Sequence, residues 1–138
     1  MACGRSCPGW EWQNPLPTGS QLEGVWGSGG SDTFAVGLQG TILHYDGADW
    51  SAMSSGTSDT LWDVWGSSGS DVFVVPGILH YDGTEWSTMN PGTGGWLFSV
   101  WGSSGTDVFV VGADGIILHY SGLPYAVYLP LVLRSDAP

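Results

Sequence analysis

The chain has 138 residues with nine Trp and 23 Gly, and its formal net charge is −11, from 13 acidic residues against two Arg. Its length fits a single domain. Nucleic acids and anionic membranes are bound through clustered cations, and Arg5 and Arg134 lie near opposite ends of the chain, so the composition argues against both partners. The longest apolar tract, 125–133, contains Pro130 and is far shorter than the roughly 20 residues of a membrane-spanning helix.

An internal repeat dominates the chain, with a period in the range that is typical of solenoids and propellers. Val-Trp-Gly occurs at 25–27, 64–66 and 100–102, and Ile-Leu-His-Tyr occurs at 42–45, 78–81 and 117–120. Each repeat contains four short runs rich in Val, Ile, Phe, Tyr and Trp, bounded by Gly, Ser and Asp, as strands and turns require. We therefore expect three four-stranded antiparallel meanders, in which Asp82-Gly83 marks a hairpin turn.

Each predicted sheet is apolar on both faces and so needs a neighbour on both sides, which radial repetition in a β-propeller supplies. The Tyr-Asp-Gly-x-x-Trp hairpins at 45–50 and 81–86 resemble the bacterial propeller repeats of the kelch, Asp-box and WD40-like group, and look most like the kelch hairpin. The resemblance covers residues 22–122. It implies an all-β fold of propeller blades, and it implies little about function.

The N-terminal residues are predicted in two parts. Residues 1–9 are expected to be a loose tail, where Cys3 and Cys7 have too few neighbouring ligands for zinc and where no signal-peptide core is present. Residues 10–16 are predicted to be an outer strand, because the interval from Trp12 to Trp26 is only one position shorter than the interval from Trp50 to Trp65.

The remaining chain divides into three blades and a tail. We predict the blades at 22–53, 61–89 and 97–128 and a C-terminal tail at 129–138. The outer strand of the third blade has two candidates, residues 10–12 and residues 125–128. Propellers have 4 to 8 blades, so three blades are expected to complete a ring as a homo-oligomer, most simply a dimer with six blades. Truncation of a longer array is the alternative.

Two polar positions repeat in every blade. His44, His80 and His119 are interpreted as packed side chains whose ring N–H bonds a backbone carbonyl or an Asp, because active sites are built from unlike groups. Asp32, Asp71 and Asp107 are expected to bond the backbone of their own turns, with calcium binding as the alternative. We expect no cofactor and no other metal.

Tryptophan is the most informative residue type. Trp26, Trp65 and Trp101 repeat on the inner strand and are expected to pack between blades. Aromatic platforms beside acids also suit sugar rings, and specificity tends to reside where repeats differ. The candidate ligand-binding residues are Trp62, Trp96, Trp50, Trp86 and Asp59.

These features favour a non-catalytic propeller that acts as a structural or binding module for a protein or glycan ligand. A carbohydrate-binding propeller is the alternative. No enzyme is expected, because the repeats lack Arg for a sialidase-like site and contain no G-x-S-x-G elbow. An extracellular or cell-surface bacterial location is expected, although this chain carries no export signal that we can identify.

Overall fold

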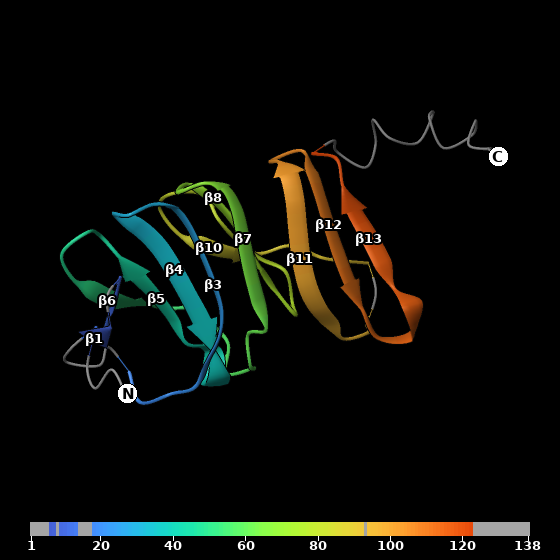
Figure 1. Ribbon diagram of the computed structural model, residues 1–138. Coiled ribbons are helices and arrows are strands. Elements are labelled where there is room, and N and C mark those ends of the chain that lie inside the picture. Colours follow the sequence, from blue (N-terminus) through green and yellow to red (C-terminus); the bar gives the residue numbers. More distant parts are fainter. Residues whose placement is uncertain (1–5, 8, 14–17, 93, 123–138) are drawn as a thin grey trace.

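The computed structural model describes residues 6–7, 9–13, 18–92 and 94–122. Three antiparallel sheets follow one another along the chain and stand side by side (Figure 1). The predicted all-β architecture of propeller blades is confirmed. None of the helical segments in the described residues has the length or the hydrophobicity to span a bilayer.

The first two sheets are four-stranded meanders, which we call blade 1 and blade 2. Blade 1 comprises β3 (Leu22–Gly29), β4 (Asp32–Gly37), β5 (Ile42–Tyr45) and β6 (Trp50–Met53). Blade 2 comprises β7 (Asp63–Ser68), β8 (Asp71–Val75), β9 (Leu79–Tyr81) and β10 (Trp86–Thr88). Side chains alternate between the two faces of a sheet, so one face of blade 2 packs on blade 1 and the other packs on blade 3.

Blade 3 has three strands in the described part of the chain: β11 (Leu97–Ser104), β12 (Asp107–Gly112) and β13 (Ile117–Tyr120). The expected outer strand at 125–128 lies outside the described residues, as does the predicted tail 129–138. β13 pairs with β12 along one edge, Val108 opposite Tyr120 and Val111 opposite Ile117.

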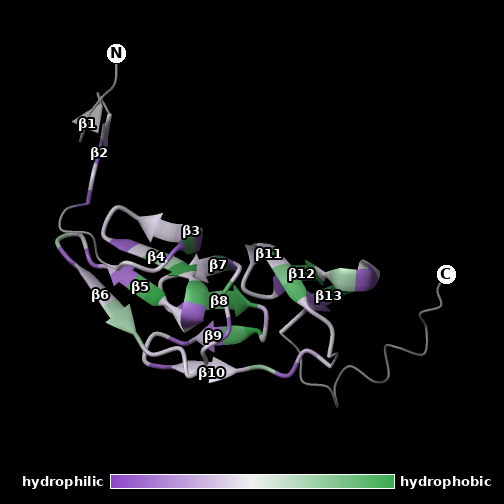
Figure 2. Ribbon diagram, turned by 90° about the horizontal axis from the view of Figure 1, so that it is seen from below, coloured by the Kyte–Doolittle hydropathy of each residue, from purple (hydrophilic) through white to green (hydrophobic). Residues whose placement is uncertain are grey.

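The N-terminal residues differ from the prediction. β1 (Ser6–Cys7) and β2 (Trp10–Glu11) form a two-stranded sheet with each other, and this hairpin stands clear of the three blades (Figure 2). Residues 10–11 therefore pair with part of the expected loose tail instead of a blade. The reason is distance: β13, the last strand of blade 3 in the described residues, lies at the far end of the row of blades, whereas residues 6–7 are close in the sequence. Residues 14–16 of the predicted outer strand lie outside the described residues.

The hairpin between the second and third strands differs among the blades. In blades 1 and 3 it contains a short helical turn, η1 (Leu38–Gly40) or η2 (Ala113–Gly115). Blade 2 has three residues fewer there, and Ile78 takes a φ of +46°. Such a backbone is strained for a β-branched side chain. This accounts for β9 beginning at Leu79, one residue after the start of the Ile-Leu-His-Tyr motif at 78–81.

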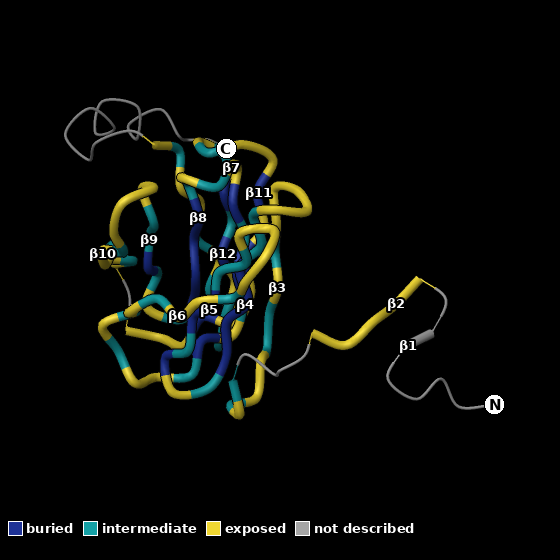
Figure 3. Tube along the Cα trace, turned by 90° about the vertical axis from the view of Figure 1, so that its left-hand side faces the viewer, coloured by how far each residue is buried: buried dark blue, intermediate teal, exposed yellow. Residues whose placement is uncertain are grey.

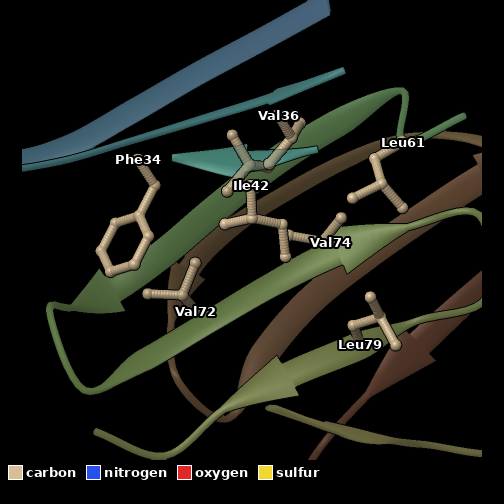
Figure 4. Close-up of a cluster of buried hydrophobic side chains, with 8 residues drawn as sticks. Phe34, Val36, Ile42, Leu61, Val72, Val74 and Leu79 are labelled. Carbon is tan, nitrogen blue, oxygen red and sulfur yellow. The ribbon is translucent and has the colours of Figure 1, made fainter. Parts of the chain in front are cut away.

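The hydrophobic core lies between the blades, as the burial-coloured trace in Figure 3 shows. One cluster joins blades 1 and 2, with Phe34, Val36 and Ile42 packed against Leu61, Val64, Val72, Val74 and Leu79 (Figure 4). A second cluster joins blades 2 and 3 and contains Phe73, Val75, Leu97, Val100, Val108 and Val110. The fold is thus stabilised by two repeated junctions.

Candidate functional site

In each blade, one aspartate at the start of the second strand bonds a serine of the first strand and a histidine of the third strand. In blade 1, Asp32 Oδ2 accepts a hydrogen bond from Ser28 Oγ at 2.7 Å, and Asp32 Oδ1 accepts one from His44 Nε2 at 2.7 Å. The same arrangement recurs in the other blades as Ser67–Asp71–His80 and Ser103–Asp107–His119. The histidines are expected to bond either a backbone carbonyl or an aspartate, and the structure shows the aspartate. The aspartates bond these side chains, whereas the sequence predicts bonds to the backbone of their turns.

The electrostatics of the networks in blades 1 and 3 favour ionised carboxylates. The hydrogen bond from Ser28 lowers the pKa of Asp32, and the contact with His44 adds to this effect. The hydrogen bond from Ser103, followed by that from His119, lowers the pKa of Asp107 in the same way. A donor on each carboxylate oxygen stabilises the charged form.

The networks do not have the geometry of a nucleophilic site. An activated serine needs its hydroxyl on the base nitrogen, but Ser28 donates to Asp32, and His44 Nε2 bonds the same carboxylate. A calcium ion at any one of these aspartates would need six to eight oxygen ligands, and both oxygens of each carboxylate already accept hydrogen bonds from serine and histidine. In the described ranges, no three His, Cys, Asp or Glu side chains come together as metal ligands.

In blades 2 and 3, the loop between the first and second strands covers the aspartate of the preceding blade. A Cβ added to Gly69 would overlap Asp32 Oδ2, and one added to Gly105 would overlap Asp71 Oδ2. The equivalent glycine of blade 1 is Gly30, which has nothing within 4 Å of such a Cβ. The absence of a side chain at these positions therefore allows neighbouring blades to approach closely.

Two of the three inner-strand tryptophans pack between blades, as expected. Trp26 lies over Gly66 of blade 2, and Trp65 lies over Gly102 of blade 3, with ring atoms 2.9 and 2.6 Å from where a Cβ would stand. Trp101 is 58% exposed, because no further blade covers this face among the residues that the structure describes. Trp26 and Trp65, at the same position of the repeat, each pack on the next blade, so Trp101 lies on a face that a further blade could cover.

The outer-strand tryptophans lie beside the tyrosines of the preceding strands. The ring centroids of Tyr45 and Trp50 are 5.1 Å apart, and those of Tyr81 and Trp86 are 5.0 Å apart. Trp86 also meets Phe34 of blade 1 edge-on at 6.2 Å and packs against the first core cluster. The proposed ligand residue Trp86 thus lies mainly in a junction between blades.

The turns that carry these aromatic pairs are four-residue loops, longer than the Asp-Gly signal alone suggests. Tyr81 pairs with Trp86, and between them Asp82 Oδ1 accepts hydrogen bonds from the N–H groups of Thr84 and Glu85 at 2.8 and 2.9 Å. These two hydrogen bonds lower the pKa of Asp82, that from Glu85 most. The loop of blade 1, around Asp46, is built in the same way.

An exposed aromatic pair stands at the start of the innermost strands. The rings of Trp62 and Phe98, from equivalent positions of blades 2 and 3, meet edge-on at 6.2 Å and are 37% and 46% exposed. Trp96, two residues before Phe98, is 59% exposed. Asp59 is exposed, and its backbone N–H bonds Thr57 Oγ1. Phe98 is not among the predicted ligand residues, although an alignment of the repeats places it at the position equivalent to Trp62.

A pocket of about 170 Å³ lies between blades 2 and 3, beside the edge of β13 that pairs with no other strand of the described residues. It is predominantly apolar, and its lining includes Phe73, Ile78, Met89, Val110, Leu118 and Tyr120. At the junction of blades 1 and 2, Trp86 of the fourth strand occupies the equivalent position beside Phe34. The pocket thus marks the place of a fourth-strand aromatic side chain of blade 3.

Comparison with known proteins places the fold among β-propellers. No family model and no curated protein matches the chain. Solved structures do match, among them "YCF48 bound to D1 peptide" and "YCF48 from Cyanidioschyzon merolae", each with a TM-score of 0.62. They are 21% and 22% identical and cover 79% and 78% of this chain, which spans about 40% of their length. The propeller part of the predicted resemblance is confirmed, while the specific likeness to kelch hairpins stays a prediction.

Proposed function

Because the chain folds as three blades of a β-propeller, we propose that it is a non-catalytic binding module that completes its ring with further copies of itself and binds a polypeptide. The observation that carries this proposal is the exposed pair formed by Trp62 and Phe98. Exposed aromatic side chains that adjacent elements hold in place supply large contact areas and often dominate binding energy.

Charge indicates which polypeptides suit this surface. The net charge of −11 favours a cationic or neutral ligand over an acidic one, both in the rate of encounter and in affinity. One of the two similar structures is a complex with a peptide, which supports the same class of ligand for this chain. We therefore expect binding to basic peptides that weakens as the salt concentration rises.

The non-catalytic part of the proposal is supported by the Ser–Asp–His networks. They repeat in all three blades, and in each one serine and histidine bond the same carboxylate. This arrangement braces the strands, and the serine hydroxyl of each network donates to the carboxylate instead of to the histidine nitrogen. Hydrolysis of chromogenic glycosides or esters, abolished by substitution of a single carboxylate, would contradict the proposal.

Calorimetric titration of the full chain with extended peptides of basic, neutral and acidic composition tests the ligand class. Trp62→Ala should weaken binding of the best peptide by about tenfold or more. Thr84→Ala is the control, because Thr84 is exposed in the turn after β9, at the end of blade 2 opposite to Trp62. Equal losses in the two variants, or a preference for acidic peptides, would overturn the proposal.

A carbohydrate ligand is the second candidate, favoured by the exposed Trp62 and Trp96 rings on an acidic chain. Sugar rings stack on such surfaces, and carboxylates bond their hydroxyls. A glycan array read by tryptophan fluorescence separates the two: a response to a sugar that Trp62→Ala abolishes would favour the carbohydrate. Either ligand suits the extracellular or surface location that we propose for a bacterial protein of this kind.

Completion of the ring is supported by the two outermost faces of the blade row. Val25 of blade 1 and Ile117 of blade 3 are each 68% exposed on these faces, and Trp101 is 58% exposed. Two copies joined head to tail would cover both faces and would have six blades. Sedimentation analysis should then give about twice the 14.5 kDa of one chain. A monomer at every concentration tested would refute self-assembly.

A further inference from the structure

We infer that the fourth strand of blade 3 is supplied by residues 10–13 of a neighbouring copy, with Trp12 in the pocket beside β13. This rests on the proposed completion of the ring by copies of the chain. It goes further, because it names the edge and the pocket that this segment would occupy. In the structure, β2 pairs with β1 and belongs to none of the three blades.

The spacing of the repeat assigns the segment to a blade that precedes blade 1. The interval from Trp50 on an outer strand to Trp65 on the next inner strand is the same as the interval from Trp86 to Trp101. The interval from Trp12 to Trp26 is only one position shorter. By this spacing, residues 10–13 correspond to the outer strand of a blade that stands before blade 1. In a head-to-tail ring of this chain, the blade before blade 1 is blade 3 of the neighbour.

A contact in the structure supports this placement independently. Trp50 Nε1 donates a hydrogen bond to Gln13 Oε1 at 3.1 Å. Trp86, which is equivalent to Trp50 in the repeat, meets Phe34 of the blade before its own. The residue after Trp12 thus already lies on the side of blade 1 that a preceding blade would cover.

The receiving edge has the right partners for Trp12. Tyr120 lies 5.6 Å from Phe73, as Tyr81 lies 5.8 Å from Phe34 at the other junction, where Trp86 packs beside both. In blade 3, the pocket of about 170 Å³ occupies the corresponding place. Trp12 is 57% exposed in the single chain, and its indole matches the Trp of blades 1 and 2 at this position.

The known register of the outer strands fixes the expected pairing. Trp50 lies opposite Tyr45 and Trp86 lies opposite Tyr81, so Trp12 should lie opposite Tyr120 and Glu11 opposite Ser121. Directly opposed residues in antiparallel strands have Cβ atoms about 4.5–5.5 Å apart, close enough for a disulfide after small adjustments.

Cross-linking tests this pairing in the full chain. In a background of Cys3→Ser and Cys7→Ser, one tagged copy carries Glu11→Cys and a second, differently tagged copy carries Ser121→Cys. Mixing and mild oxidation should give a disulfide-linked pair of copies. The control replaces Ser121→Cys by Ser87→Cys, on the already paired outer strand of blade 2, and should give about tenfold less product.

Substitution separates this inference from its main competitor, residues 125–128 of the same chain. Trp12→Ser should weaken self-association by about tenfold or more, whereas Tyr125→Ser should leave it unchanged. The reverse pattern, or association without the cross-link between Glu11→Cys and Ser121→Cys, overturns the strand exchange while self-assembly stands. A full chain that never associates overturns both.

Discussion

The internal junctions and the outer faces of this molecule are built from the same residues in different surroundings. Val25, Val64 and Val100 occupy one position of the repeat, yet Val25 is 68% exposed, whereas Val64 and Val100 are 4% and 5% exposed. Leu22, Leu61 and Leu97 differ in the same way, at 41%, 1% and 0%. Burial at these positions depends on whether a neighbouring blade is present, because each blade can bury its faces only against another sheet.

The two outer faces are also not perfect copies of the internal ones. Blade 1 has Thr33 and Ala35 where blade 2 has Val72 and Val74 on the face toward the preceding blade. A junction made with this face buries less apolar surface than the internal junctions, and apolar area is the main source of their stability. We therefore expect any contact made through this face to be weaker and more reversible than the junctions within one chain.

The largest effect should distinguish Trp65 from Trp101. Trp65→Ala should lower the free energy of unfolding by about 3–5 kcal/mol, because it empties a site in the second core cluster. Trp101→Ala should cost under about 1 kcal/mol in dilute solution, because its ring is 58% exposed. Urea titration of both variants measures the difference. Equal losses would mean that Trp101 is covered in the isolated chain.

A smaller effect should separate two equivalent glycines. Gly69→Ala should destabilise the fold by about 1–3 kcal/mol, because its Cβ would displace Asp32 from its bonds with Ser28 and His44. Gly30→Ala meets nothing within 4 Å and should be neutral or slightly stabilising. Thermal unfolding of the two variants provides the comparison, and a cost at Gly30 as large as that at Gly69 would remove the distinction.

The smallest effect is a dependence on acid. Asp32 and Asp107 have lowered pKa values in the folded chain, so each stabilises the fold above the ordinary aspartate pKa of about 3.9. That contribution is lost as the pH falls through their folded values. The denaturation midpoint should therefore decrease below about pH 4, and Asp32→Asn should make the decrease shallower. A midpoint that does not change between about pH 5 and pH 3 would argue against this role.

Much of the fold follows from the repeat alone. The short apolar runs and the turn residues between them predict the meanders. The two apolar faces of each sheet predict the packing of Trp26 and Trp65 between blades. The Ser–Asp–His networks were harder to predict, because the separation of Asp from His in the sequence is larger in blade 1 than in blade 2. Only the strand register, with His44 opposite Phe34 and His80 opposite Phe73, keeps the contact constant.

The N-terminal hairpin could not have been predicted from spacing. The repeat indicates which blade residues 10–13 would complete, but the pairing that forms depends on which strand edge is within reach. In one chain, Ser6 and Cys7 are nearby, so β2 pairs with them. The missed residue Phe98 is a different case, because comparing the variable positions of the repeats was sufficient to find it.

The shortened hairpin of blade 2 makes the three blades unequal at the end that carries Trp62. Blades 1 and 3 project the turns η1 and η2 there, whereas blade 2 turns back three residues earlier, and Trp62 N–H bonds Val75 O beside that turn. A ligand that contacts this end would meet one distinct site in each copy instead of three similar sites. A ring of two copies would then bind two ligands in twofold-related orientations, and a bivalent partner would gain avidity from their fixed separation.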